Sequence, residues 1–304
     1  MTQSPDALRT ARLIAGAPDL YAALRAAAAD GVAPLADVLL ALDQADPATA
    51  SRLRSVDAGL VAAVQRVGAG LPAIKTAPAV ARFLAEVQAV PLFQPDVATS
   101  RTCALLTASE VPDMPAFSDR AFDGWFAGQG VPYGLGSYGE YRTVYQTDQF
   151  ADAASPERRC VHLGVDVFAA TGTQVHAPLD GQVLHLTYNP DPLDYGHTLI
   201  LRHDAGPAPF FTLYGHLGAS LPRLLSVGDT VCAGQMIGHL GDWHENGGWA
   251  AHVHFQVMTD MLAQTGGNFF GVGHASLWEV WSAICPDPNL VLRIDPDRFR
   301  GPQI

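Results

Sequence analysis

The sequence predicts an α+β protein, in which an N-terminal helical bundle is followed by a mostly antiparallel β-domain. The first hundred residues or so are rich in alanine and are punctuated by helix-start patterns. After residue 160 the chain changes to short alternating or β-branched runs separated by Gly, Pro, Asn and Asp, which is typical of antiparallel strands. All eleven histidines lie in this second part, the first being His162. We therefore expect the chemistry of the protein there.

The bulk composition indicates an ordinary globular chain of one or two domains. The chain has 304 residues, of which 48% are hydrophobic and 16% charged. Its net charge of -12, from 18 basic and 30 acidic residues, argues against nucleic acid as a partner. No apolar stretch approaches the roughly eighteen residues of a membrane span, and the start does not resemble a secretory signal. We expect a cytoplasmic protein, although export by another route stays open.

Residues 1–115 are predicted to be helical. The sequences SPD at 4–6, APD at 17–19 and DP at 46–47 place proline and capping residues where helices begin. We expect about five short helices up to about residue 92. A packed cap on the second half is favoured over a docking or dimerisation module, because this part contains no histidine and no polar constellation. One buried helical face is predicted from apolar residues three or four positions apart: Leu53, Val56, Leu60, Val64 and Val67.

Residues 116–160 are predicted to form a Gly/Tyr-rich connecting region, an ordered loop with little regular structure. Four of its polar and aromatic residues either line a cleft or lie on the surface, and the sequence favours neither possibility. They are Tyr138, Glu140, Tyr141 and Arg142.

Residues 161–304 are predicted to form the β-domain. Runs such as GQVLHLTY, HTLILRH and FFTLYGHL have the length and residue types of strands, and turn residues separate them. A helix over Ala275–Ile284 and a proline-rich tail, CPDPNLVLRIDPDRF, are expected to close the chain. Four scattered cysteines without a CxxC pair indicate neither a disulfide framework nor a cysteine zinc site.

The run WAAHVHFQV places two histidines one residue apart. Side chains alternate along a strand, so His252 and His254 would share one face while Ala251, Val253 and Phe255 face the core. A lone pair of this kind is more often structural than metal-binding. Its meaning therefore depends on partners elsewhere in the chain.

Two further segments supply such partners. In CVHLGVDVF, His162, Gly164 and Asp166 would share one strand face, and the glycine would leave space for a bound ion. In LYGHL, His216 follows a glycine at the end of an apolar run. Two same-face ligand pairs and one further, isolated histidine, each on a β-like segment, are far more specific than any one of these features alone.

In this order, HLGVD, YGHL and HVHF resemble the three signature segments of the lysostaphin-type zinc metallopeptidases, the LytM-like endopeptidases. The similarity covers roughly residues 138–260. It implies a β-domain of the LytM/lysostaphin (duplicated hybrid motif) type with a groove that holds one Zn²⁺ ion and no other cofactor. The resemblance implies that His162, Asp166 and His254 bind the metal and that His216 and His252 are catalytic.

The implied arrangement agrees with the chemistry of these side chains. Three N/O ligands leave a fourth position for water, whose pKa the metal lowers. His252 would act as general base and His216 would hydrogen-bond the oxyanion. The remaining histidines match no ligand position and are expected to be surface or hydrogen-bonded residues: His176, His185, His197, His203, His239, His244 and His274.

The sequence departs from many secreted relatives just before the second histidine pair, where ENGGWAAHVHF lacks a Ser/Thr-containing turn and has Ala251 in place of a proline. Other segments, such as YGEYRTVY, PLDYGHTLILRH and CPDPNL, resemble a cytoplasmic branch associated with class III aminotransferase-like and kinase-like domains. We expect a peptide or small-amide substrate. Peptidoglycan is the family's usual substrate, a small amino-acid-derived metabolite is the alternative, and a non-catalytic binding module is the third possibility.

Overall fold

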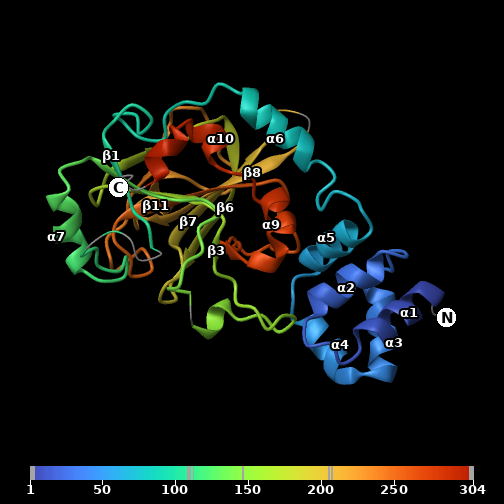
Figure 1. Ribbon diagram of the computed structural model, residues 1–304. Helices are drawn as coiled ribbons and strands as arrows, with labels where there is room; N and C mark the ends of the chain where they lie inside the picture. Colours follow the sequence, from blue (N-terminus) through green and yellow to red (C-terminus); the bar gives the residue numbers. More distant parts are fainter. Residues whose placement is uncertain are drawn as a thin grey trace.

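The computed structural model describes residues 4–300 except 108–110, 112, 146, 205 and 207. Five helices, α1–α5, form a group beside the rest of the molecule (Figure 1). Asp19, Asp46 and Asp57 cap α2, α4 and α5, since each carboxylate accepts a hydrogen bond from a backbone N–H of the first turn. The bounds are α1 (Pro5–Ile14), α2 (Leu20–Ala28), α3 (Leu35–Ala45), α4 (Pro47–Arg54) and α5 (Ala58–Gly68).

A sixth helix, α6 (Ala77–Glu86), precedes residue 92, so the described chain has one helix more than the five expected there. The predicted single face from Leu53 to Val67 is wrong, because it crosses a helix boundary. Leu53 lies in α4, whereas Leu60 and Val64 lie in α5, which the Asp57 cap begins anew. The apolar spacing continues across the turn because both helices bury residues in the same core.

The region expected to have little regular structure contributes to the sheet. It contains α7 (Ala121–Gly128), β2 (Tyr133–Gly136) and the 3-10 turn η1 (Asp148–Phe150), and β1 (Thr102–Ala104) lies just before it. The strand β2 has the sequence YGLG, and its glycines indicate a loop when only propensity is considered. A Cβ at Gly134 would lie 2.5 Å from Leu105, so tertiary packing requires the glycine.

The central sheet has eight strands in the order β1-β2-β4-β11-β8-β7-β6-β9, and every neighbouring pair except β1 and β2 is antiparallel. The predicted α+β class with a mostly antiparallel sheet is therefore confirmed. The strands are β4 (Val165–Phe168), β6 (Gly181–Asn189), β7 (Gly196–His203), β8 (Phe210–Leu217), β9 (Thr230–Val231) and β11 (His252–Met258). Two small sheets pair β5 (Gln174–His176) with β10 (Met236–His239), and β3 (Val161–His162) with β12 (Val272–Gly273).

Each face of the sheet has its own hydrophobic core. One core joins Val253 and Phe255 of β11 to α6 and α10 (Asn289–Leu292). The other joins Met258 of β11 to α1–α5 and α9 (Trp278–Ile284). Figure 1 shows α6 and α9 on different sides of the strands. The alternation of β11 places His252 and His254 on the face turned towards α9, away from Val253 and Phe255, as predicted.

The end of the chain follows the expected pattern. The 3-10 turn η2 (Ala275–Leu277) runs into α9, which together cover the predicted helix over 275–284. The short α8 (Leu221–Leu224) and the terminal 3-10 turn η3 (Pro296–Phe299) complete the described elements. None of the described helices is long and apolar enough to cross a membrane.

Candidate metal centre

Three buried side chains from separate strands converge at one point. His254 in β11 lies opposite Asp166 in β4, and His162 ends β3. His254 Nδ1 lies 2.9 Å from His162 Nε2 and 3.1 Å from Asp166 Oδ1, and His162 Nε2 lies 3.2 Å from Asp166 Oδ1. Ligand atoms about 2.1 Å from a tetrahedral metal ion are about 3.4 Å apart. The three atoms lie 2.9–3.2 Å apart, slightly closer than this, and the part of the chain that is described contains no second cluster of this kind.

Two glycines make room for aromatic rings at the centre, Gly164 for that of His254 and Gly215 for that of Tyr195. A Cβ at Gly164 would lie 2.6 Å from His254 Cε1, and a Cβ at Gly215 would lie 2.5 Å from the ring of Tyr195. We expected Gly164 to leave space for the ion itself. The space is instead filled by the imidazole of His254, one of the candidate ligands. His162 and Asp166 also lie on two short strands rather than on one continuous strand.

Hydrogen bonds orient both candidate imidazole ligands. His162 Nδ1 donates to the backbone oxygen of Ser137 at 2.8 Å, and His254 Nε2 donates to Gln256 Oε1 at 2.8 Å. Gln256 is held in turn, since its amide donates to the backbone oxygen of Phe270. These bonds leave the lone pairs of His162 Nε2 and His254 Nδ1 facing Asp166. Gln256 is not among the predicted site residues, although HVHFQ places it on the strand face of the two histidines.

A buried arginine pairs with the candidate carboxylate ligand. Arg142 Nη1 donates to Asp166 Oδ2 at 2.7 Å, and Arg142 Nε donates to Glu140 Oε2 at 2.8 Å. Burial alone would raise the pKa of Asp166, but His162 and Arg142 outweigh it and hold that pKa well below its usual range. Asp166 is therefore ionised, with Oδ1 free to bind a metal. Gly136 is needed here, because a Cβ there would lie 2.7 Å from Arg142 Nη2.

His216 and His252 lie beside the three converging residues, with ring centroids 4.2 Å apart. The Nδ1 atom of His252 donates to the backbone oxygen of Ala250 at 2.7 Å, and that of His216 donates to the backbone oxygen of Asn246 at 2.8 Å. Burial lowers the pKa of His252 to about 4 and holds that of His216 well below its usual value. Both rings are therefore neutral at pH 7, and each has an unprotonated Nε2.

The backbone at His216 is unusual. Its φ is 62°, in the left-handed region, and the pairing of β7 with β8 shifts by one residue at this point. Such a bulge redirects a side chain from the regular face of a strand. The N–H of His216 donates to the backbone oxygen of Tyr195, which fixes the bulge. Regular alternation would not have placed His216 against His252.

All five predicted site residues therefore lie close together. Of the other residues considered in the sequence, some line the neighbouring cavity and others lie away from it. Arg142 lines a cavity of about 380 Å³ beside the centre, whereas Tyr141 is 54% exposed. Tyr138 donates to the backbone oxygen of Cys285, away from the cavity. Among the remaining histidines, His203 is buried and hydrogen-bonded to Thr212, and His244 is exposed.

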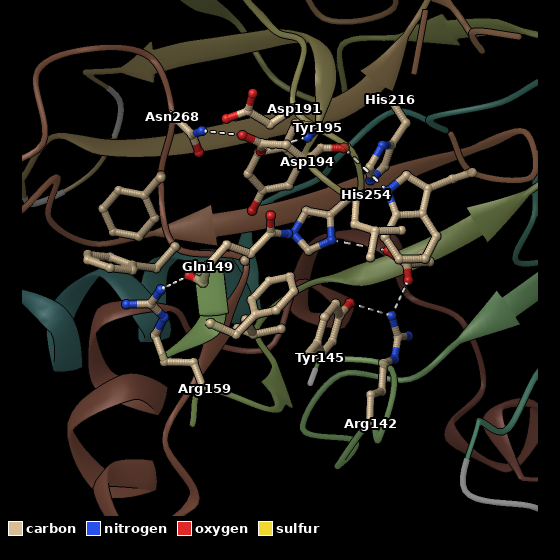
Figure 2. Close-up of a pocket in the computed structure, with 18 of the residues that line it drawn as sticks. Arg142, Tyr145, Gln149, Arg159, Asp191, Asp194, Tyr195, His216, His254 and Asn268 are labelled. Atoms are coloured by element: carbon tan, nitrogen blue, oxygen red, sulfur yellow. Dashed lines mark hydrogen bonds and ion pairs between the residues drawn. The ribbon is translucent and has the colours of Figure 1, made fainter. Parts of the chain in front are cut away.

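Figure 2 shows the cavity with the candidate centre at one side. Tyr195 lies beside the His254 ring, with ring centroids 5.2 Å apart, and its buried hydroxyl has no hydrogen-bond partner among the described residues. Burial raises the pKa of this phenol well above its usual value, so the hydroxyl stays protonated. Tyr195 is not among the predicted site residues, since a single tyrosine after an aspartate is not a recognisable pattern. Aromatic side chains make up much of the remaining wall: Phe117, Tyr145, Phe150, Trp249, Phe269 and Phe270.

Comparison with known proteins agrees with this geometry. Residues 160–265 match peptidase family M23, and they include all five residues discussed above. This part of the chain is therefore similar to the domain of peptidase family M23. No curated protein sequence matches the chain.

Several solved structures are similar over part of the chain. A zinc-containing peptidase from Vibrio cholerae is 27% identical over 33% of this chain and 28% of that chain, with a TM-score of 0.26. Lysostaphin from Staphylococcus simulans is 25% identical over 56% of this chain and 52% of that chain, with a TM-score of 0.34. Its catalytic domain is 24% identical over 51% of this chain and 96% of that chain, with a TM-score of 0.32. The matches thus span less than two thirds of the Vibrio protein and of full-length lysostaphin.

Proposed function

We propose that this chain, which carries a peptidase family M23 domain, is a zinc-dependent hydrolase that cleaves a peptide or amide bond. The observation that carries the proposal is the 2.9–3.2 Å spacing of two imidazole nitrogens and one carboxylate oxygen. Two nitrogens and one oxygen suit Zn²⁺, and three protein ligands leave a fourth position open. When bound by His162, Asp166 and His254, Zn²⁺ supplies a Lewis acid that polarises a carbonyl and lowers the pKa of water.

His252 is the proton acceptor in this proposal. Its Nε2 carries a lone pair and lies 3.9 Å from Asp166 Oδ1, so it faces the candidate ligands. A ring that is neutral at pH 7 can take a proton from the attacking water and then deliver that proton to the leaving nitrogen. Its plane is fixed by stacking on Phe168, with ring centroids 4.4 Å apart.

The oxyanion donor requires more than His216 alone. The bond from His216 Nδ1 to Asn246 leaves Nε2 without a proton, so His216 can donate from Nε2 only after that atom has been protonated. The hydroxyl of Tyr195 is a donor at every pH near neutrality and lines the same cavity. We therefore assign oxyanion stabilisation to the hydroxyl of Tyr195, because the His216 ring is neutral at pH 7 and its Nε2 carries no proton to donate.

Metal analysis and turnover test the two parts of the proposal separately. We expect one zinc ion per chain in the wild-type protein and in His252→Ala, and a large loss of zinc in His162→Ala. His252→Ala should lower turnover of a pool of short peptides by about 10²–10⁴-fold, which is the usual contribution of a general base. His244→Ala is the matched control, because His244 is an exposed histidine outside the centre.

Two outcomes would count against the proposal. A wild-type protein that holds no zinc with all five residues intact would remove the metal from the mechanism. A His252→Ala variant that keeps both its zinc and full turnover would remove the assigned base, and intact biological function in that variant would favour a non-catalytic binding module.

A further inference from the structure

The cavity beside the candidate centre contains an arginine whose charge is only partly neutralised. The side chain of Arg159 is 16% exposed, and its guanidinium carbon lies 5.1 Å from the centroid of the Phe270 ring. Arg159 Nη2 donates to the backbone oxygen of Gln149 at 2.7 Å. Its ion-pair partner, Asp152 Oδ2, lies 3.9 Å from Nη1, which is too far for a hydrogen bond.

Asp152 is occupied by other groups. Its Oδ2 accepts a hydrogen bond from the Tyr21 hydroxyl at 2.9 Å and lies 3.4 Å from His274 Nε2, and its Oδ1 accepts one from the N–H of Ala154. Burial accordingly lowers the pKa of Arg159 in spite of the nearby carboxylate. A guanidinium has five N–H groups, and only one of those of Arg159 makes a hydrogen bond to a described residue.

The charge of the second arginine in the cavity, Arg142, is by contrast paired with carboxylates. Arg142 makes hydrogen bonds to two carboxylates, Asp166 and Glu140, and their charges raise its pKa although burial would lower it. Its charge is therefore already paired, and Arg159 is the cavity cation left to attract an anion.

The wall across from Arg159 is acidic. Figure 2 shows Arg159 with Gln149 on one side of the cavity, and Asp191, Asp194 and Asn268 on the other. Asp194 accepts a hydrogen bond from Asn268, and Asp191 is exposed at the surface. One cation facing two carboxylates disfavours a dianion such as phosphate and favours a ligand with separated opposite charges. A volume of about 380 Å³ is also in the range of pockets that enclose small molecules.

We propose that the cavity binds a short peptide by its free carboxylate, which accepts hydrogen bonds from Arg159, while its amino-terminal part faces Asp191 and Asp194. The inference deepens the proposed function and rests on it, since the amide bond to be cleaved would lie at the metal, on the amino-terminal side of the anchored carboxylate. The substrate class is then short peptides with a free carboxyl end.

Calorimetric binding of tri-alanine and of tri-alanine amide tests the anchor. The zinc-loaded His252→Ala protein is used, so that neither peptide is cleaved during the measurement. We expect the free acid to bind at least about ten-fold more tightly than the amide, as is usual for a charge-assisted pair of hydrogen bonds. Adding Arg159→Gln should abolish this preference. Adding Arg158→Gln should keep it, because Arg158 carries the same charge but pairs with Asp148 outside the cavity lining.

Three results would overturn the inference. They are equal binding of acid and amide, absence of binding of both peptides, and a preference for the acid that persists in Arg159→Gln, which would mean that the carboxylate binds the metal directly. Zinc content and circular dichroism of each variant verify that it is folded. Amine release by the wild-type protein is measured separately. If the acid preference depends on Arg159 but no peptide is cleaved, the proposed hydrolase function fails while the anchor stands.

Discussion

Substitution Gly164→Ala is expected to displace a metal ligand without changing any ligand residue. The added Cβ would lie 2.6 Å from His254 Cε1, 2.7 Å from His254 Nε2 and 2.9 Å from the backbone oxygen of Phe255. Carbon atoms normally approach no closer than about 3.5 Å, so the ring must move by roughly 1 Å. Metal–ligand distances tolerate only about 0.2 Å. We therefore expect zinc affinity to fall at least about ten- to a hundred-fold, with about 1–3 kcal/mol of overpacking strain in the metal-free protein.

Competition with a chromogenic chelator measures the zinc affinity, and urea unfolding of the metal-free protein measures the strain. Gly124→Ala is the control, because Gly124 lies in α7 and a Cβ there would meet nothing within 4 Å. That variant should keep wild-type zinc affinity. The reasoning is refuted if Gly164→Ala also keeps it, since His254 would then tolerate the methyl group without leaving its position.

Three further predictions concern buried hydrogen bonds. Gln256→Met removes the acceptor of His254 Nε2–H and should weaken zinc binding about 10–100-fold in the same competition assay. Burial lowers the pKa of His203. Below about pH 6.5 its imidazole is therefore protonated in the unfolded state but stays neutral in the folded state. The contribution of His203 to stability should therefore fall with falling pH by up to about 1.4 kcal/mol per pH unit, and His203→Gln should reduce the overall slope by this amount in urea unfolding at several pH values. Tyr21→Phe removes the donor to Asp152 Oδ2 and should lower the free energy of unfolding by about 1–3 kcal/mol.

Each of these three substitutions has a control at an exposed residue of the same type: Gln182→Met, His244→Gln and Tyr188→Phe. In the controls, the zinc affinity, the pH dependence of stability and the free energy of unfolding should change little. Unchanged zinc affinity in the Gln256 variant would contradict the orienting role of its amide. Parallel pH slopes in the His203 variant and the wild type would contradict the burial of a neutral ring. Equal stability of the Tyr21 variant and the wild type would mean that Asp152 finds another donor.

The five residues of the candidate site were identifiable from sequence because strand alternation and family resemblance both operate over a few adjacent positions. HVHF shows which side chains share a face, and the structure has His252 and His254 on that face. The same rule failed for β2, because a strand that contains two glycines has no local pattern of a strand. It also failed for the run from Leu53 to Val67, where the apolar spacing continues across two helices.

The sequence by itself determined the α+β class, the segments that carry the site and the identity of its candidate ligands. Only the tertiary structure decided that Gly164 makes room for a ring, that Arg142 is paired and that Arg159 is largely free to bind an anion. The physical reason is the separation along the chain of the residues that determine each property. Side-chain direction along a strand is set by the local backbone, whereas charge compensation, ring tautomers and cavity shape depend on contacts between residues far apart in the chain.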